Sequence, residues 1–266
     1  MIKVGHDLTD AEIAARYDAF GGELSMHSDF YPAVAEFIGD VRGQRVLDAG
    51  CGAGQLLVEL HRRNPTAELY GLEISSANVD KARTHLGDAA HIMQASLTNL
   101  PPLPAAFFDT VILTEVLEHL RSPLQALLAL KPLLKPQGAF VITFPNSAAW
   151  LPFSGLAALL APLIRPMRGF LPHEHPLRTE QPIDTVFSQH EVFAILHQAG
   201  LRITDRACRE TFPYVLEFFY KFGRMANPPR MWQRLDRWVS QRGWTVLGYR
   251  IFVRCQPIQA MHRGTR

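Results

Sequence analysis

The sequence predicts an α/β fold, in which a mostly parallel sheet is covered by helices on both faces. Apolar runs typical of strands alternate along the chain with stretches typical of helices, and a repeated strand-then-helix order builds a parallel sheet. A glycine-rich turn follows the first strong strand, within residues 46–55, and indicates where a ligand binds. The length of 266 residues and the hydrophobic fraction of 47% suffice for one such domain with insertions.

Helical patterns occupy the beginning of the chain. Thr9 and Glu12 have the spacing of a capping box, and Ile13 and Tyr17 lie on one side of the helix that follows. A second helix is predicted at about residues 30–38, directly before the first strand of the sheet.

After the glycine turn, the predicted elements follow in a regular order. They are a helix at 53–63, a strand at 68–73, a helix at 76–86, strands at 91–94 and 110–114, a helix from Ser122-Pro123 and a strand at 139–144. Ser188 and Glu191 form another capping box, which opens a helix that ends at Gly200, and apolar strands follow at 201–208 and 249–255. Right-handed crossovers then place the ligand site at the carboxyl ends of the strands.

The glycine turn has the pattern G-x-G-x-G, with Gly50, Gly52 and Gly54 directly after Asp48. Glycines permit positive φ angles and a close approach of the backbone to a ligand, and the next helix offers unpaired N–H groups. A dinucleotide fingerprint would have its third glycine at Gln55. A carboxylate at the strand end repels a pyrophosphate and suits an ammonium group. The turn therefore favours a nucleoside that carries an amino acid over NAD.

This turn resembles motif I of the class I S-adenosylmethionine-dependent methyltransferases. Glu73 lies about twenty residues further on, where Rossmann-like folds place the acid that holds ribose hydroxyls. The stretches 100–109, 115–120, 133–138 and 144–146 resemble the ubiquinone-biosynthesis-type and related small-molecule methyltransferases, so the resemblance covers about residues 40–205. It implies a Rossmann-like seven-stranded sheet, mostly parallel, with an antiparallel last strand and lid insertions.

The resemblance also implies S-adenosylmethionine as the cofactor and a set of residues that bind it. These are Asp48, Gly50, Cys51, Gly52, Gly54, Gln55, Glu73, Ile74, Ser96, Leu97 and Thr114. Ser96 stands where the family usually has an acid near the adenine, and its hydroxyl can make one hydrogen bond there. Because such N-terminal segments commonly fold over the cofactor, Tyr17 either lines the pocket or only packs its helix onto the sheet.

His119 and Glu118 are the catalytic candidates, because they follow the strand that ends beside the expected methyl group. If the acceptor is a hydroxyl, histidine is the base best suited to neutral pH. Glu115, Glu118 and His119 also resemble a divalent-metal site of some relatives, which His173 or His175 could complete. The pattern recurs in relatives that need no metal, and we assign none.

Four segments are expected: a helical cap at 1–40, the cofactor-binding core at 41–147, an apolar lid at 148–187 and the rest of the core at 188–266, with an insertion at 211–243. Residues 148–164 carry no charge but contain helix-breaking prolines and a glycine, so this stretch favours a lid over the active site and not a membrane-spanning helix. The alternative to a lid is a pair of helices that completes the core. The aromatic and basic residues of 211–244 suit an ordinary amphipathic helix slightly better than a surface that contacts a membrane or a partner protein. Residues 148–172 are the other candidate for such a contact.

Charge and cysteine usage restrict the class of protein. Residues 1–204 carry 15 Lys and Arg against 21 Asp and Glu, whereas residues 205–266 carry 12 against 4. The sequence contains no dense block of Lys and Arg, so we do not expect it to bind nucleic acid. Cys51, Cys208 and Cys255 lack paired spacing, and no signal peptide is visible, so we expect a cytoplasmic protein, with membrane association left open. The predicted function is O-methylation of a small lipophilic or aromatic acceptor; C- or N-methylation and a non-catalytic scaffold are the alternatives.

Overall fold

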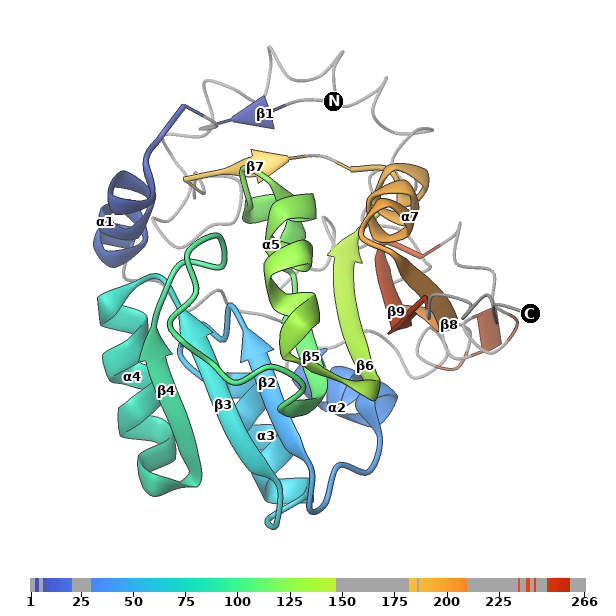
Figure 1. The fold of residues 1–266 in the computed structure, drawn as a ribbon, viewed down its shortest axis with the longest axis horizontal. Helices are drawn as coiled ribbons and strands as arrows, with labels where there is room; N and C mark the ends of the chain where they lie inside the picture. Colours follow the sequence, from blue (N-terminus) through green and yellow to red (C-terminus); the bar gives the residue numbers. More distant parts are fainter. Residues whose placement is uncertain are drawn as a thin grey trace, which may run out of the picture.

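The computed structural model describes residues 3–4, 7–20, 30–146, 182–185, 187–209, 234, 238–239, 242 and 248–258. Within them, a seven-stranded sheet has the order β4-β3-β2-β5-β6-β9-β8 (Figure 1). Its strands are β2 (Arg45–Ala49), β3 (Glu68–Glu73), β4 (Ala90–Gln94), β5 (Phe108–Thr114), β6 (Leu134–Pro145), β8 (Leu201–Arg209) and β9 (Arg250–Pro257). Strands β2 to β6 pair in parallel, and β9 pairs antiparallel with both β6 and β8. The predicted fold class is confirmed.

Helices cover both faces of this sheet (Figure 1). On one face, α2 (Phe30–Ile38), α3 (Gln55–Arg63) and α4 (Ser76–Leu86) share an apolar core with the strands, and on the other face α5 (Pro123–Leu130) and α7 (Gln189–Gln198) do the same. Successive strand residues alternate between the two cores, because side chains on a strand point to opposite faces. Val46 thus packs on the side of α3, and Leu47 packs on the side of α5.

Several predicted boundaries are confirmed, and others are corrected. The strand at 68–73, the helix at 76–86 and the helix start after Ser122 are as expected. The predicted helix at 53–63 begins only at Gln55, because Gly54 has a φ of 85° and leaves the helical region. Strands β5 and β6 are longer than predicted, since Phe108 also pairs with Leu134. Both bonds of the Ser188 capping box are present.

The N-terminal helix α1 (Asp10–Phe20) lies at the edge of the sheet where the parallel strands end (Figure 1). Beside it, β1 (Lys3–Val4) pairs antiparallel with β7 (Asp184–Thr185). This two-stranded sheet was not predicted, because two residues carry no period-2 pattern. Leu8, Ile13 and Ile183 form a small apolar cluster there, against which Tyr17 and Ile74 pack. The cluster joins α1 to the far end of the predicted lid segment.

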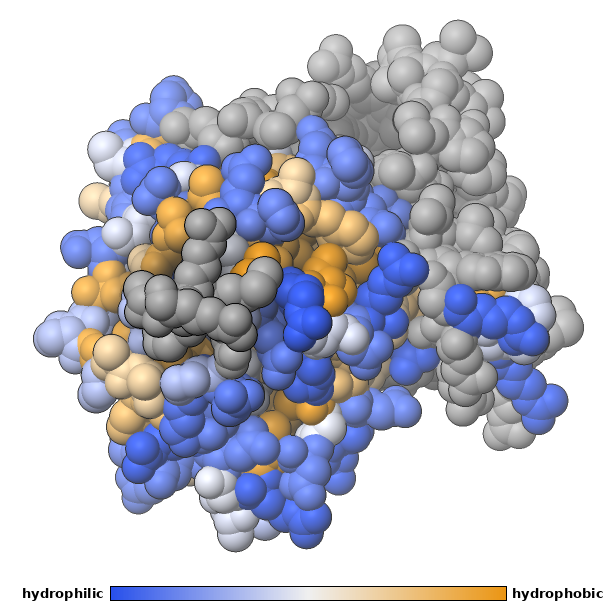
Figure 2. Space-filling model, turned by 45° about the vertical axis from the view of Figure 1, so that its right-hand side comes forward, coloured by the Kyte–Doolittle hydropathy of each residue, from blue (hydrophilic) through white to orange (hydrophobic). Residues whose placement is uncertain are grey.

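Most of the two predicted insertions lies outside the described residues. Of 148–187, only 182–185 and 187 are described, and of 211–243 only four residues are. Among those four, Val239 is buried in the core, and the Arg242 guanidinium lies 3.8 Å from the centre of the Trp238 ring. Where the chain is described, no helix is long and apolar enough to cross a bilayer. Hydrophilic residues cover most of the described surface on the face shown in Figure 2, with apolar side chains in smaller areas between them.

Candidate cofactor and acceptor site

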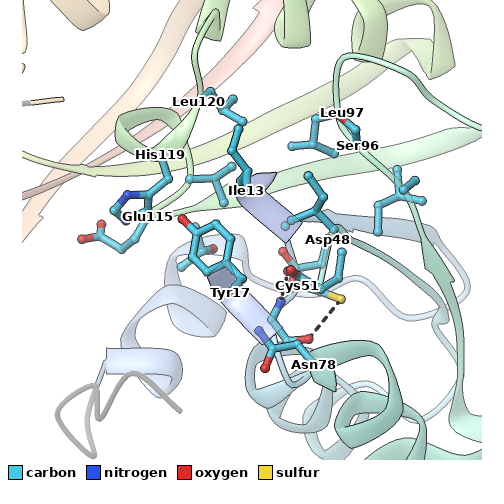
Figure 3. Close-up of a pocket in the computed structure, with 18 of the residues that line it drawn as sticks. Ile13, Tyr17, Asp48, Cys51, Asn78, Ser96, Leu97, Glu115, His119 and Leu120 are labelled. Carbon is cyan, nitrogen blue, oxygen red and sulfur yellow. Dashed lines mark hydrogen bonds between the residues drawn. The ribbon is translucent and has the colours of Figure 1, made fainter. Parts of the chain in front are cut away.

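A cavity lies at the carboxyl ends of four neighbouring strands, β4, β3, β2 and β5 (Figure 3). Strand β2 is flanked by β3 on one side and β5 on the other, so the chain reverses its direction of travel across the sheet at this point. Open α/β sheets bind their ligands at such switch points. The lining includes most of the predicted site residues, namely Asp48, Gly50, Cys51, Gly52, Gln55, Glu73, Ile74, Ser96, Leu97, Thr114 and His119.

The glycine turn has the predicted backbone. Gly50, Gly52 and Gly54 have φ angles of 92°, 53° and 85°, in the left-handed region that favours glycine. A Cβ atom on Gly50 would lie 2.6 Å from a side-chain methyl of Val116, so the turn also packs too closely for any larger residue. Gly54 does not line the cavity; it is the N-cap residue of α3.

Asp48 is a buried carboxylate that faces this cavity from the end of β2. It is 2% exposed, and its Oδ1 has no hydrogen-bond partner in the described part of the protein. Burial raises the pKa of Asp48 to about 7, and the nearby Glu73 carboxylate adds to this effect. A buried acceptor of this kind fits an ammonium group, because a cation satisfies the orphaned oxygen and offsets the cost of its desolvation.

Glu73 is held by backbone amides at the end of β3. Its Oε2 accepts a hydrogen bond of 3.0 Å from Gly52 N, and its Oε1 accepts one of 2.9 Å from Ser75 N. Burial raises the pKa of this carboxyl, although these hydrogen bonds oppose the shift. The amides therefore orient the carboxylate beside the glycine turn. The lone pairs of Glu73 that the amides do not use can accept hydrogen bonds from ligand hydroxyls.

The end of the cavity beside β4 is formed by two elements far apart in sequence. Ser96 and Leu97 follow β4, and Asp10 and Ile13 come from α1. The Ser96 hydroxyl donates a hydrogen bond of 2.6 Å to Asp10 Oδ2, so the two segments are joined directly. Tyr17 packs on the cluster formed by Leu8, Ile13 and Ile183 and also lines the cavity. Of the two alternatives for Tyr17, the structure agrees with the one in which it lines the pocket.

The opposite end of the cavity holds His119 and Glu115, while Ser96 and Leu97 lie across from them (Figure 3). His119 is in the short 3-10 helix η2 (Leu117–His119), and its Nδ1 lies 2.8 Å from the carbonyl oxygen of Ile183. Because a carbonyl only accepts, Nδ1 is the protonated nitrogen in this contact. Glu118 is buried and does not line the cavity; its Oε1 is 3.9 Å from His119 Nε2.

Sequence reasoning missed several residues that line the cavity. The sequence does not single out Asp10, although this residue lines the cavity. Ile183 and Asn78 were not considered. A single polar residue in the first turn of a helix gives no local signal of a distant contact, so Asp10 and Ile183 emerge only when α1 and the segment before α7 are placed on the sheet.

The parallel sheet, its switch point, the glycine turn and the acid at the end of β3 together define a Rossmann-like nucleoside-binding domain. Residues 47–142 match the family described as "Methyltransferase domain". These residues therefore form a class I S-adenosylmethionine-dependent methyltransferase domain, and S-adenosylmethionine is the cofactor of this domain.

Similar proteins agree with this assignment. The ubiquinone biosynthesis O-methyltransferase of Alkalilimnicola ehrlichii is 34% identical over 116 residues, which are 42% of this chain and 46% of that protein. Its counterpart in Ruegeria pomeroyi is 32% identical over 166 residues, 62% of each chain. The chain thus spans between about half and three fifths of these relatives. A putative methyltransferase solved in complex with the Haloferax volcanii Trm112 activator shares the fold, with a TM-score of 0.64 at 18% identity, over 94% of this chain and 100% of that one.

Proposed function

We propose that this chain transfers the methyl group of S-adenosylmethionine to a hydroxyl group of a small lipophilic or aromatic acceptor. The observation that carries the proposal is the contact between His119 Nδ1 and the Ile183 carbonyl, which leaves the basic nitrogen of a neutral imidazole at Nε2. The names of the relatives, which are O-methyltransferases, support oxygen as the methylated atom.

The residues at the strand ends fit the cofactor. Asp48 would bind its ammonium group, and Glu73 would accept hydrogen bonds from its ribose hydroxyls. Ile74 and Leu97 supply apolar surface, and Thr114 supplies a buried hydroxyl oxygen that has no partner in the described residues. When bound, the cofactor supplies an electrophilic methyl group, so the protein has mainly to align the acceptor and exclude water.

His119 is the proposed general base. Nε2 of His119 would accept the hydroxyl proton of the acceptor, and the Ile183 carbonyl would keep the ring oriented. Glu118, buried 3.9 Å from Nε2, stabilises the imidazolium that forms. Glu118 acts through His119 in this proposal, because it does not reach the cavity.

The acceptor class follows from the apolar lining around His119. Tyr17, Val116, Leu120 and Ile183 line the cavity on that side with largely apolar surface, and Glu115 there is already held by Thr143 and Arg250. The lid at 148–187, through which an acceptor would enter, lies almost entirely outside the described residues. Contact of 148–172 and 211–244 with a membrane or a partner protein stays a prediction from the sequence.

The experiment is a mass-spectrometric search for labelled products. Purified protein is incubated with S-adenosylmethionine that carries a deuterated methyl group and with an extract of its own cell. A mass shift in a lipophilic hydroxylated compound, with the label on oxygen, is the expected result. Label on carbon or nitrogen would replace the O-methylation proposal. Confirmed cofactor binding without label anywhere would favour the scaffold alternative.

Three histidine variants separate catalysis from positioning once a product is known. His119→Asn keeps an N–H near Nδ1 for the Ile183 carbonyl but removes the base, so kcat should fall by about 10²–10⁴-fold. His119→Gln should lose both the base and the hydrogen bond to the Ile183 carbonyl. His197 is exposed on α7, so His197→Gln should leave kcat unchanged. An equal kcat in wild type and His119→Asn would exclude His119 as the base.

A further inference from the structure

Asp10 places a carboxylate in the cofactor cavity from outside the sheet. It is in the first turn of α1, and it lines the cavity together with Ser96 and Leu97. Its Oδ2 accepts hydrogen bonds of 2.6 Å from the Ser96 hydroxyl and 3.1 Å from the Thr98 hydroxyl, while its Oδ1 accepts one from the Arg121 guanidinium. This cluster joins α1 to two segments that lie more than 80 positions further along the chain.

The strand order determines which part of the cofactor meets this cluster. Glu73, at the end of β3, lies between the end of β4 on one side and the ends of β2 and β5 on the other. The ribose connects the adenine to the part of the cofactor that carries the ammonium group. If the ribose is held at Glu73, one of these two parts lies toward β4 and the other lies toward β2 and β5. Asp48 fits the ammonium-bearing group, and His119 lies beyond it, after β5. The adenine is left at the β4 end, beside Ser96, Leu97 and Asp10.

We propose that Asp10 binds the adenine of the cofactor by accepting a hydrogen bond from its 6-amino group. The segment after β4 has no acid of its own, because Ala95-Ser96-Leu97 follows the strand. Ser96 donates its proton to Asp10, so this hydroxyl positions the carboxylate instead of donating to the adenine. In this proposal Asp10, 86 positions earlier in the chain, makes the adenine contact that the sequence analysis expects of Ser96.

The carboxylate has the capacity for this additional bond. A carboxylate offers about four lone-pair positions, and the Ser96, Thr98 and Arg121 groups use three of them. The remaining position is on Oδ1, for which the described residues provide one partner, Arg121. The hydrogen bond from Ser96 lowers the pKa of Asp10 despite its partial burial, so the group is ionised at neutral pH and accepts only.

The other carboxylates of the cavity are committed elsewhere. Glu73 is held by the amides of Gly52 and Ser75, and Asp48 lies at the end of β2. Glu115, at the far end, accepts from Thr143. Asp10 is therefore the acid that stands beside Ser96 and Leu97 among the residues that the structure describes.

Asp18 provides a matched control on the same helix. It binds the Ser75 hydroxyl at 2.7 Å, the Ser76 hydroxyl at 3.0 Å and the Ala77 amide at 3.1 Å, so it also fastens α1 to the core. It does not line the cavity. A loss of affinity that comes only from a loosened helix should therefore occur in Asp18 and Asp10 variants alike.

The inference rests on the assigned cofactor and not on the acceptor, and calorimetry of the full chain tests it. Two ligands are compared: S-adenosylhomocysteine and its analogue with hydrogen in place of the 6-amino group. Wild type should bind the amino compound about 10–100-fold more tightly, as one hydrogen bond to a charged group implies. Asp10→Ala should reduce this preference to within about twofold, whereas Asp18→Ala should preserve it while weakening both ligands equally.

Asp10→Asn keeps the size of the side chain and should also lower the preference, which protects the test if Asp10→Ala fails to fold. An undiminished preference in the Asp10 variants would overturn the inference and leave the cofactor assignment intact, as would equal affinities of wild type for the two ligands. A wild-type protein that binds neither ligand would overturn both.

Discussion

Glu115 Oε2 lies 3.4 Å from Arg250 Nε and joins the end of β5 to the start of β9. Both side chains are nearly buried, at 8% and 11% exposed, and Thr143 donates a hydrogen bond of 2.9 Å to the other oxygen of Glu115. The Arg250 guanidinium also lies 4.4 Å from the centre of the Phe30 ring. The backbone of Glu115 has a φ of 52°, an uncommon value for a residue with a side chain. The pair therefore fastens a strained turn beside the acceptor end of the cavity.

Breaking this pair on one side should destabilise the protein strongly. Arg250→Met leaves the buried Glu115 carboxylate without its cation, and we expect a loss of about 3–5 kcal/mol in the free energy of unfolding. Glu115→Gln combined with Arg250→Met should cost less than Arg250→Met alone. Urea denaturation measures all variants.

The exposed pair of Asp40 and Arg42 is the control, because its side chains are 56% and 66% exposed. Arg42→Met should change the free energy of unfolding much less than Arg250→Met, because solvent screens an exposed ion pair. If Arg250→Met were no more destabilising than Arg42→Met, the burial of the Glu115 pair would have no energetic consequence.

Metal chelation should leave methyl transfer unchanged to within about twofold. Glu115 is bound by Thr143 and Arg250, and His119 Nδ1 is bound to the Ile183 carbonyl, so these potential ligand atoms already have partners within the protein. No group of three potential ligand side chains is arranged for a metal ion among the described residues, which exclude His173 and His175. Activity that disappears with EDTA and returns with Mg²⁺ would contradict this prediction.

Cofactor affinity should rise with pH up to about 7, because Asp48 has to be ionised to bind the ammonium group. Its pKa is raised to about 7 in the cofactor-free protein, so binding should release a proton below that pH and weaken by up to about tenfold per pH unit. Calorimetry in buffers of different ionisation enthalpy measures the released proton. Asp48→Asn should bind at least tenfold more weakly and show no such dependence near pH 7.

The same shift has a consequence for the stability of the cofactor-free protein. A carboxyl whose pKa is raised on folding contributes stability below its unfolded pKa of about 4, and this contribution is lost as the pH rises through the folded value. Between pH 4 and 7 the contribution of Asp48 should therefore decline, and Asp48→Asn should melt no lower than wild type at pH 8. A large drop in the Tm of that variant would show that the Asp48 charge stabilises the cofactor-free fold.

Gly50→Ala should disrupt the cofactor turn more than the same change at another glycine with positive φ. Its Cβ would meet Val116 at 2.6 Å in addition to the strain of a φ of 92°, so we expect a loss of about 2–4 kcal/mol. Gly43→Ala, with a φ of 70° and nothing within 4 Å, should cost only about 1–2 kcal/mol. Thermal unfolding compares the two, and equal losses would mean that Val116 yields at no cost.

Local sequence patterns predicted the elements and much of the site. The turn from Asp48 to Gly54 and the Ser188 capping box depend on residues that are close together in the chain. Glu73 is recognised by its spacing of about twenty residues from that turn. The alternation of strands and helices likewise determined the parallel sheet. These features need no knowledge of distant contacts.

Tertiary structure alone decided how the two ends of the cavity are completed. Asp10 reaches Ser96 across 86 positions, and Glu115 reaches Arg250 across an even longer separation. The pairing of β1 with β7 and the position of Ile183 beside His119 are of the same kind. No periodicity or spacing encodes such contacts, because they depend on which surface a helix or strand end presents once the whole sheet is packed. The sequence by itself determined a cofactor-binding α/β core, and packing decided which carboxylates and carbonyls surround the cofactor and the acceptor.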